Sequence, residues 1–195
     1  MAGVSRKEQR ERTHQLLLDA TMSCLVEFGH SDTTTQRIQD EAGVSRGALL
    51  HHFGSKTELL VAAIHHIADI RVANIDAMIA DLGDGPDALR DMVTALRQAM
   101  TGPPFQAALE LWTASRTDPQ LREALLPAER RLGQRIRAVF DEHSGISDPR
   151  DSELAFESLL ALIRGFEITR NMRSDQRVAD LVIDDWIARA SAMQD

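Results

Sequence analysis

Apolar residues recur every three or four positions along most of the chain, and this spacing constrains the fold more than any other feature. Side chains three or four residues apart share one face of an α-helix, so each such stretch predicts a helix with one buried side. We find no convincing run of alternating β-branched residues bounded by turns, which a half-buried strand would need. The sequence therefore predicts an all-α fold.

Glycine, proline and capping residues divide the chain into about nine helices. The first is expected over about residues 6–28, with Gly29 ending it, and a short second helix runs from the threonines at 33–35 to Ala42. The others are expected over about 45–52, 55–81, 86–100, 104–117, 119–143, 149–172 and 175–193. We see no internal repeat and no low-complexity segment.

The composition excludes several classes of protein. The 195 residues carry a net charge of −8, which argues against a protein that coats nucleic acid over its whole surface. The only cysteine, Cys24, excludes internal disulfides and a thiolate zinc cage. No apolar run approaches the roughly 20 residues that span a bilayer, and the polar start lacks the apolar segment of a signal peptide. We therefore expect a cytoplasmic protein with no membrane partner.

Residues 33–56 predict two short helices joined by a tight turn at Gly43. The apolar side chains of this segment can pack against the first helix: Ile38, Ala42, Val44, Leu49 and Phe53. The side chains left outside are Gln36, Arg37, Arg46, Gly47, His51 and His52. A DNA major groove, about 12 Å wide, admits such a second helix. Hydroxyl and backbone N–H groups at the helix starts suit phosphate oxygens, here at Thr34, Thr35, Ser45 and Ser55, and Lys56 adds a charge.

Several residues of this region together form a recognisable pattern: Phe28-Gly29, the threonines at 33–35, Ile38, Ala42-Gly43-Val44-Ser45, Gly47, Leu49, His52-Phe53 and Ser55-Lys56. With this pattern the chain resembles the TetR family of bacterial transcriptional regulators over about residues 10–60, while later residues match only in helix number and spacing. The resemblance implies a helix-turn-helix DNA-binding domain at residues 1–54 and a helical ligand-binding and dimerisation domain at residues 55–195. It also implies that the protein binds an operator and represses transcription, and that a small molecule relieves this repression.

Carried over position by position, the resemblance assigns two kinds of DNA contact. Phosphate contacts fall on Thr35, Ser45, Leu50, His51, His52 and Lys56, and base contacts on Gln36, Arg46, Gly47 and Ala48. Leu50 departs from the family pattern, which typically has Tyr there, so an apolar contact to a thymine methyl or a sugar replaces a phenolic contact to phosphate. The basic residues near position 10 could reach DNA as an arm, but Glu8 and Glu11 between them favour a solvated helix start.

Other residues suggest chemistry that the sequence supports less well. Two pairs of residues could bind a metal ion: His51-His52 and His65-His66, and Asp69 also lies one helical turn after His65. The sequence identifies no third ligand, so we expect no metal and no cofactor. Cys24 lies on the apolar face of the first helix and is expected to be an inert core thiol. A helical small-molecule carrier or enzyme is the alternative function, although no Ser-His-Asp or paired-carboxylate spacing supports an enzyme.

An apolar set in the middle of the chain has two interpretations, plain core or part of a cavity for a small apolar ligand. Its members are Met92, Leu96, Met100, Phe105, Leu109, Trp112 and Arg116, facing Phe156, Leu160 and Ile163. The polar group that orients the ligand would be Arg116, Glu110 or Thr113, and the sequence does not choose among them.

Small residues form a narrow stripe on the helix expected over about 149–172, and such a stripe permits close approach of another helix. The stripe and the apolar residues of the last helix predict an intermolecular four-helix bundle in a homodimer, with burial inside one chain as the alternative. The residues concerned are Ala155, Ser158, Leu162, Gly165, Thr169, Val178, Leu181, Val182 and Trp186.

Overall fold

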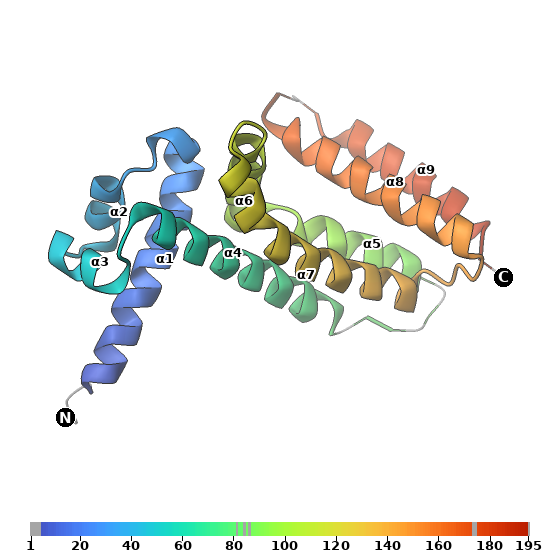
Figure 1. Cartoon of the computed structure of the whole chain (residues 1–195). Helices are drawn as coiled ribbons and strands as arrows, with labels where there is room; N and C mark the ends of the chain where they lie inside the picture. The colour runs from blue at the N-terminus through green and yellow to red at the C-terminus, as the bar shows by residue number, and fades with distance from the viewer. Residues whose placement is uncertain (1–4, 81, 84, 86, 173–174, 195) are drawn as a thin grey trace. The chain divides into compact units, whose positions relative to one another are not determined.

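The computed structural model describes residues 5–80, 82–83, 85, 87–172 and 175–194. These ranges hold nine α-helices, one short 3-10 helix and no strand, so the predicted all-α class is confirmed (Figure 1). The helices are α1 (Arg6–Asp32), α2 (Thr35–Ala42), α3 (Arg46–His52), α4 (Lys56–Ile79), α5 (Ala88–Ala99), α6 (Gly102–Ser115), α7 (Pro119–His143), α8 (Pro149–Ile168) and α9 (Arg177–Ser191), with the 3-10 helix at Arg170–Met172. Residues 81 and 86, where two helix ends were expected, lie outside the described residues.

The chain divides into two compact units. Unit 1 comprises residues 1–70 and 102–129, and unit 2 comprises residues 71–101 and 130–195. Helices α4 and α7 each contribute residues to both units. No helix among the described residues is long and apolar enough to cross a membrane.

The core of unit 1 explains why α2 and α3 form a fixed pair. Helix α1 packs against both α2 and α6, and Figure 1 shows α2 and α3 beside the middle of α1. The predicted packing residues Ile38, Leu49 and Phe53 are buried beside Leu17 and Cys24 of α1, and Ala42 and Val44 pack partly buried against the same cluster. A second apolar cluster joins α1, α4, α6 and the start of α7.

Gly29 interrupts α1 as the sequence predicts. Its backbone has φ 72° and ψ 173°, a conformation that a residue with a Cβ rarely adopts. Phe28, which the helical spacing places on the apolar stripe, is 37% exposed, and the Arg37 guanidinium lies over its ring at 4.1 Å from the centroid. The stripe therefore ends before Phe28, and the ring instead positions a cation of α2.

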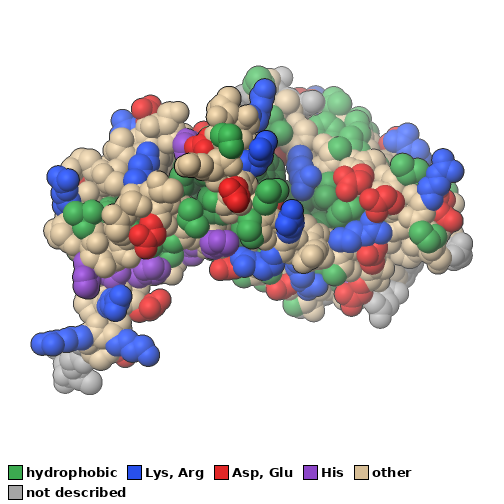
Figure 2. Space-filling view, viewed as in Figure 1, with side chains coloured by type: hydrophobic (Ala, Val, Ile, Leu, Met, Phe, Trp, Pro, Cys, Tyr) green, Lys and Arg blue, Asp and Glu red, His purple; other side chains and the backbone are tan. Residues whose placement is uncertain are grey.

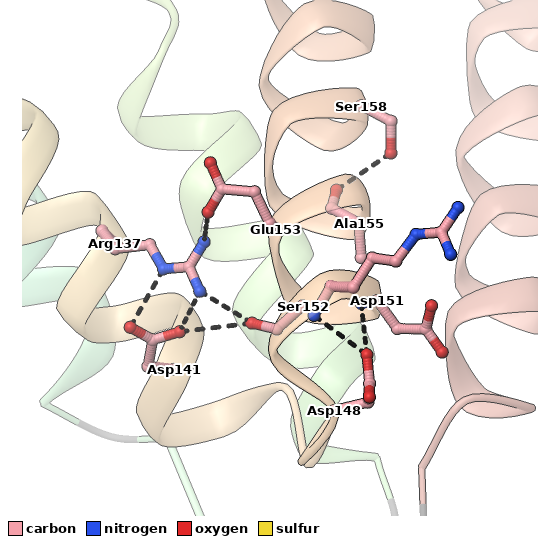
Figure 3. Close-up of polar contacts among 9 residues, drawn as sticks. Arg137, Asp141, Asp148, Asp151, Ser152, Glu153, Ala155 and Ser158 are labelled. Atoms are coloured by element: carbon pink, nitrogen blue, oxygen red, sulfur yellow. Dashed lines mark hydrogen bonds and ion pairs between the residues drawn. The ribbon is translucent and has the colours of Figure 1, made fainter.

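Polar contacts fix α8 to the end of α7 in unit 2 (Figure 3). The Arg137 guanidinium donates to Glu153 Oε2 at 3.0 Å, to Ser152 Oγ at 2.8 Å and to Asp141 Oδ2 at 3.0 Å. The Asp141 and Glu153 carboxylates raise the pKa of this guanidinium, with the hydrogen bond to Asp141 as the largest cause. Because Arg137 also lies over the Phe156 ring, at 4.8 Å, both the polar and the apolar packing of α8 depend on it.

Candidate functional site

The turn between α2 and α3 is built around Gly43. This residue has φ 64° and ψ 33°, the left-handed conformation that favours glycine, and it ends α2. The N–H of Val44 donates to the carbonyl of Gln39 at 3.1 Å, which closes the end of the helix and redirects the chain. Helix α3 then begins after only Ser45 as its N-cap. The result is the predicted helix, tight turn and second helix.

Hydroxyl groups stand at the N-termini of both short helices. Ser45 Oγ accepts a hydrogen bond from the N–H of Ala48 at 3.2 Å, and Thr34 Oγ1 accepts one from the N–H of Arg37 at 3.3 Å. Because the oxygens act as acceptors in these caps, each hydroxyl hydrogen remains able to donate to a phosphate oxygen. Thr33, the first of the three threonines, is buried, and its hydroxyl donates to the Gly29 carbonyl at 2.7 Å.

Most of the residues predicted to contact DNA bases lie on the exposed surface of α2 and α3. Gln36, Arg46 and Gly47 are exposed and Ala48 is half-buried. The Gln36 amide donates to Asp40 Oδ1 at 2.9 Å, so the side chain is held along α2 in this DNA-free chain. Gly47 has no side chain, so the surface of α3 is low there, although a Cβ would have room: its nearest neighbour would be Ser45 Oγ, at 3.9 Å.

The predicted phosphate-contacting residues are also accessible to different degrees. Thr34, Ser45, His51 and Lys56 are exposed, and Leu50 is 51% exposed although it is a large apolar side chain. Thr35 and His52 are half-buried. Leu50 is therefore accessible, and its contact to a thymine methyl or a sugar stays a prediction.

Histidine rings cluster at the end of α3, a feature that the sequence reading missed in part. The His14 ring of α1 stacks on Phe53 at 4.8 Å between centroids and lies 5.8 Å from the ring of His52. Burial, and then the proximity of His14, His51 and Arg10, lower the pKa of His52. Figure 2 shows histidine side chains close to basic ones at this end of unit 1. His14 precedes Leu17 and Leu18 by one helical turn, so its spacing places it on the apolar face of α1 but does not indicate that it meets His52.

The sequence matches two protein families, which together cover most of the chain. Residues 17–63 match "Bacterial regulatory proteins, tetR family", and residues 86–191, more than half of the chain, match "BetI-type transcriptional repressor, C-terminal". The chain belongs to the TetR family. It is therefore a DNA-binding transcriptional regulator of the helix-turn-helix type, and the matched TetR segment contains both α2 and α3.

Individual TetR-family proteins agree with this assignment. The chain is 30% identical over 159 residues to the HTH-type transcriptional regulator BetI of Burkholderia cenocepacia, covering 80% of each protein. It is 31% identical over 140 residues to the HTH-type transcriptional regulator CymR of Pseudomonas putida, covering 70% of this chain and 67% of that protein. The crystal structure of a TetR-family regulator from Cytophaga hutchinsonii has the same fold, with a TM-score of 0.77 at 13% identity and coverage of 99% and 98%.

The predicted ligand-binding residues are divided between the two units of this TetR-family chain. In unit 2 the predicted residues are all buried: Met92, Leu96, Met100, Phe156, Leu160 and Ile163. Met100 and Ile163 also line a hollow of about 140 Å³, together with Arg97 and Gln176. In unit 1, Phe105 is buried and Trp112 is half-buried, with the two rings edge to face at 5.7 Å. Leu109 is half-buried, and the three candidate polar residues are exposed: Glu110, Thr113 and Arg116.

The predicted dimer-interface residues lie on α8, at its C-cap Thr169 and on α9, and the two helices pack side by side in unit 2 (Figure 1). Ala155 and Trp186 are buried within the unit, Ser158, Gly165, Val178 and Leu181 are exposed, and Leu162, Thr169 and Val182 are half-buried. Four of these residues, Ala155, Ser158, Leu162 and Trp186, line an apolar groove of about 630 Å³, to which Leu154 and Met193 also contribute. Leu154 and Ile168, 57% and 55% exposed, were missed because the stripe was read from small residues.

The histidines and the cysteine that the sequence analysis considered for metal or thiol chemistry have identifiable surroundings in the structure. Within the described ranges, no three His, Cys, Asp or Glu side chains come together as a metal site. His66 Nε2 lies 2.7 Å from Asp19 Oδ1, which joins α4 to α1. Cys24 is buried, and its burial raises the pKa of the thiol, so thiolate chemistry is suppressed there.

Proposed function

We propose that this regulator reads its operator with α3 in the major groove, while the starts of α2, α3 and α4 contact phosphates on either side. The supporting observation is the Gly43 turn, which is followed at once by a capped helix with an exposed polar face. In this proposal Gln36, Arg46, Gly47 and Ala48 face base edges. The phosphate contacts come from Thr34, Thr35, Ser45, Leu50, His51, His52 and Lys56.

The operator-bound form is proposed to be a homodimer built on α8 and α9. The exposed apolar residues of these helices support it, since Leu154, Ile168 and Leu181 are each more than half exposed in the single chain. Patches of this kind mark interaction surfaces in proteins of this size. A two-fold dimer would present two copies of α3 to two half-sites of a palindrome.

Operator release is proposed to follow binding of a small apolar ligand in the C-terminal region, so that the protein acts as a repressor. The hollow lined by Met100 and Ile163 supports a ligand contact in unit 2, because its walls combine apolar side chains with polar and charged ones that can orient a ligand. The polar and charged side chains are Arg97, Thr101, Glu167, Arg170 and Gln176. Residues 1–54 would then form the reading domain and residues 55–195 the sensing and dimerisation domain, with α4 as the continuous connection. We further propose that the protein works in the cytoplasm and catalyses no reaction, as suits a transcriptional regulator.

The experiment that tests this function sequences the genomic fragments that the purified protein retains. We expect one enriched motif with approximate dyad symmetry, because one short helix reads few base pairs and a dimer doubles the site. The half-site centres should lie about one helical turn apart, roughly 34–36 Å, or a multiple of it. Enrichment of no sequence over input, or of a motif without a dyad, would contradict the proposal.

A further inference from the structure

A small pocket lies within unit 1, beside the last turn of α1 and the first turns of α4 and α7. Its volume is about 220 Å³. Leu60, Leu121 and Ala124 form an aliphatic floor, and these side chains belong to the apolar cluster that joins α1, α4 and α6. Lys56, His30 and Asp118 supply the polar groups of its lining. None of the residues predicted to bind the apolar effector lines this pocket.

The polar side chains that line the pocket differ in whether they already have hydrogen-bond or ion-pair partners within the chain. Asp118 Oδ1 accepts hydrogen bonds from the N–H groups of Gln120 and Leu121, both at 3.0 Å, and so caps the start of α7. Lys56 is exposed and, among the described residues, has no ion-pair partner. His30 is half-buried and offers a ring N–H donor. A ligand entering this pocket therefore meets a cation and a donor, whereas Oδ1 of the Asp118 carboxylate is held at the start of α7.

The size of the pocket limits its ligand. A volume of about 220 Å³ is below the roughly 300–1,000 Å³ of pockets that hold drug-sized ligands, so the pocket suits a small organic molecule. The aliphatic floor favours a short alkyl or aryl body. The Lys56 ammonium favours an anionic end group, since charge-assisted hydrogen bonds to a carboxylate are the stronger ones.

We propose that this pocket binds a small organic carboxylate, and that the bound carboxylate competes with operator phosphate for Lys56. The second part of the proposal rests on the proposed DNA contact of Lys56, whereas the binding site itself does not. The pocket would then be a second input to the regulator, located in the unit that carries α3. Because the coupling is reciprocal, the factor by which the carboxylate weakens operator binding must equal the factor by which operator DNA weakens carboxylate binding.

The first test uses hexanoate as the probe and the DNA-free, full-length protein. Methyl NMR signals of Leu60, Leu121 and Ala124 should shift on titration to about 10 mM, a range that detects dissociation constants near 1 mM. Hexanamide and hexylammonium have similar bodies without the negative charge, and each should bind at least about tenfold more weakly. Unshifted methyl signals, or equal binding of the three probes, would overturn the proposed site.

Two variants test the location of the site. Ala124→Leu fills the floor and should abolish the hexanoate shifts, while Ala138→Leu, the same change at an exposed position of α7, should leave them unchanged. His30→Phe keeps a ring in the lining, removes its N–H donor and should weaken hexanoate binding at least about threefold. Full hexanoate binding by both Ala124→Leu and His30→Phe would overturn the proposed location.

The operator measurement then separates this proposal from the proposed function. Operator affinity is measured with hexanoate and with sodium chloride at equal concentration, because ionic strength alone weakens DNA binding. The excess loss caused by hexanoate should be several-fold in the parent chain and absent in Ala124→Leu. Hexanoate binding with no excess loss would overturn the competition for Lys56. A protein that binds no DNA even without hexanoate would instead contradict the proposed function, since the NMR test needs no DNA.

Discussion

The indole N–H of Trp186 on α9 donates a hydrogen bond to Ser158 Oγ on α8 at 2.9 Å. Ser158 Oγ in turn donates to the carbonyl of Ala155 at 3.0 Å, so both hydroxyl functions are used within unit 2. Trp186 is only 6% exposed and forms part of the apolar groove that α8 and α9 present. The pair thus fixes the spacing of the two helices whose outer faces carry the proposed dimer interface.

Replacing Gly165 by Leu should break the proposed dimer. Gly165 is exposed, and a Cβ built on it meets no atom within 4 Å of its own chain, so the cost of a larger side chain would come from the partner. Sedimentation should show a monomer for Gly165→Leu and a dimer for Gly133→Leu, a helical glycine of α7 that is equally unobstructed. A dimeric Gly165→Leu protein would leave the stripe on α8 outside the interface.

Arg137→Lys should lower the free energy of unfolding by about 1–2 kcal/mol, although it keeps the charge. A single ammonium group cannot reproduce the separate guanidinium contacts to Asp141, Ser152 and Glu153 (Figure 3). Urea unfolding measures the change. The matched control is Arg189→Lys, whose guanidinium forms one exposed pair with Asp185, and this change should stay within about 0.5 kcal/mol of the parent. Equal unfolding curves for Arg137→Lys and the parent would show that the network adds no stability.

The sequence predicted the all-α fold and the backbone of α2, the turn and α3. Both depend on interactions between residues that are close in the sequence. Gly43 and Ser45 specify a turn and a cap through their own backbone and hydroxyl chemistry, and both lie as expected. The same holds for Ser55, whose hydroxyl accepts from the N–H of Glu58 at 3.0 Å. In a capping box Glu58 would accept from the N–H of the cap residue, Ser55, but it accepts from the N–H of Gly54 at 2.9 Å instead.

Helical spacing shows which side chains share a face, but it does not show which part of the protein covers that face. The residues whose surroundings differ from the prediction differ for this reason. Phe28 continues the apolar stripe of α1, yet it is partly exposed, and its ring lies under the Arg37 guanidinium of α2. Trp186 shares a face with proposed interface residues but is buried against α8 of its own chain. The ring cluster of His14 and His52 joins residues 38 positions apart in the sequence, and only the fold brings them together.

Ser45→Ala should destabilise the protein by about 1 kcal/mol, because the N–H of Ala48 loses its acceptor at the start of α3. Ser191→Ala, at the exposed end of α9, should change the free energy of unfolding by less than about 0.5 kcal/mol. Thermal unfolding of the two variants provides the comparison. If the two losses are the same, the cap contributes nothing beyond an ordinary surface serine.

His52 should titrate below the ordinary histidine pKa of 6.5, mainly because it is partly buried and also because His14 lies nearby. The unfolded chain then binds the proton more readily, so stability from this group is present above pH 6.5 and is lost as pH falls through the lower folded pKa. An NMR titration of the His52 imidazole should show the low value, and His14→Gln should raise it. A His52 pKa at or above 6.5 in the parent chain would contradict this reading of the cluster.

The most direct test of the reading role of α3 compares Arg46→Ala and Lys56→Ala on operator and scrambled DNA over a range of salt concentrations. Lys56→Ala should weaken binding to both DNAs alike and reduce the slope of log affinity against log salt by about 0.9, the value for one phosphate contact. Arg46→Ala should cost about 1–3 kcal/mol on the operator and relax the preference at one base position. Equal losses for Arg46→Ala on operator and scrambled DNA would contradict base reading by α3.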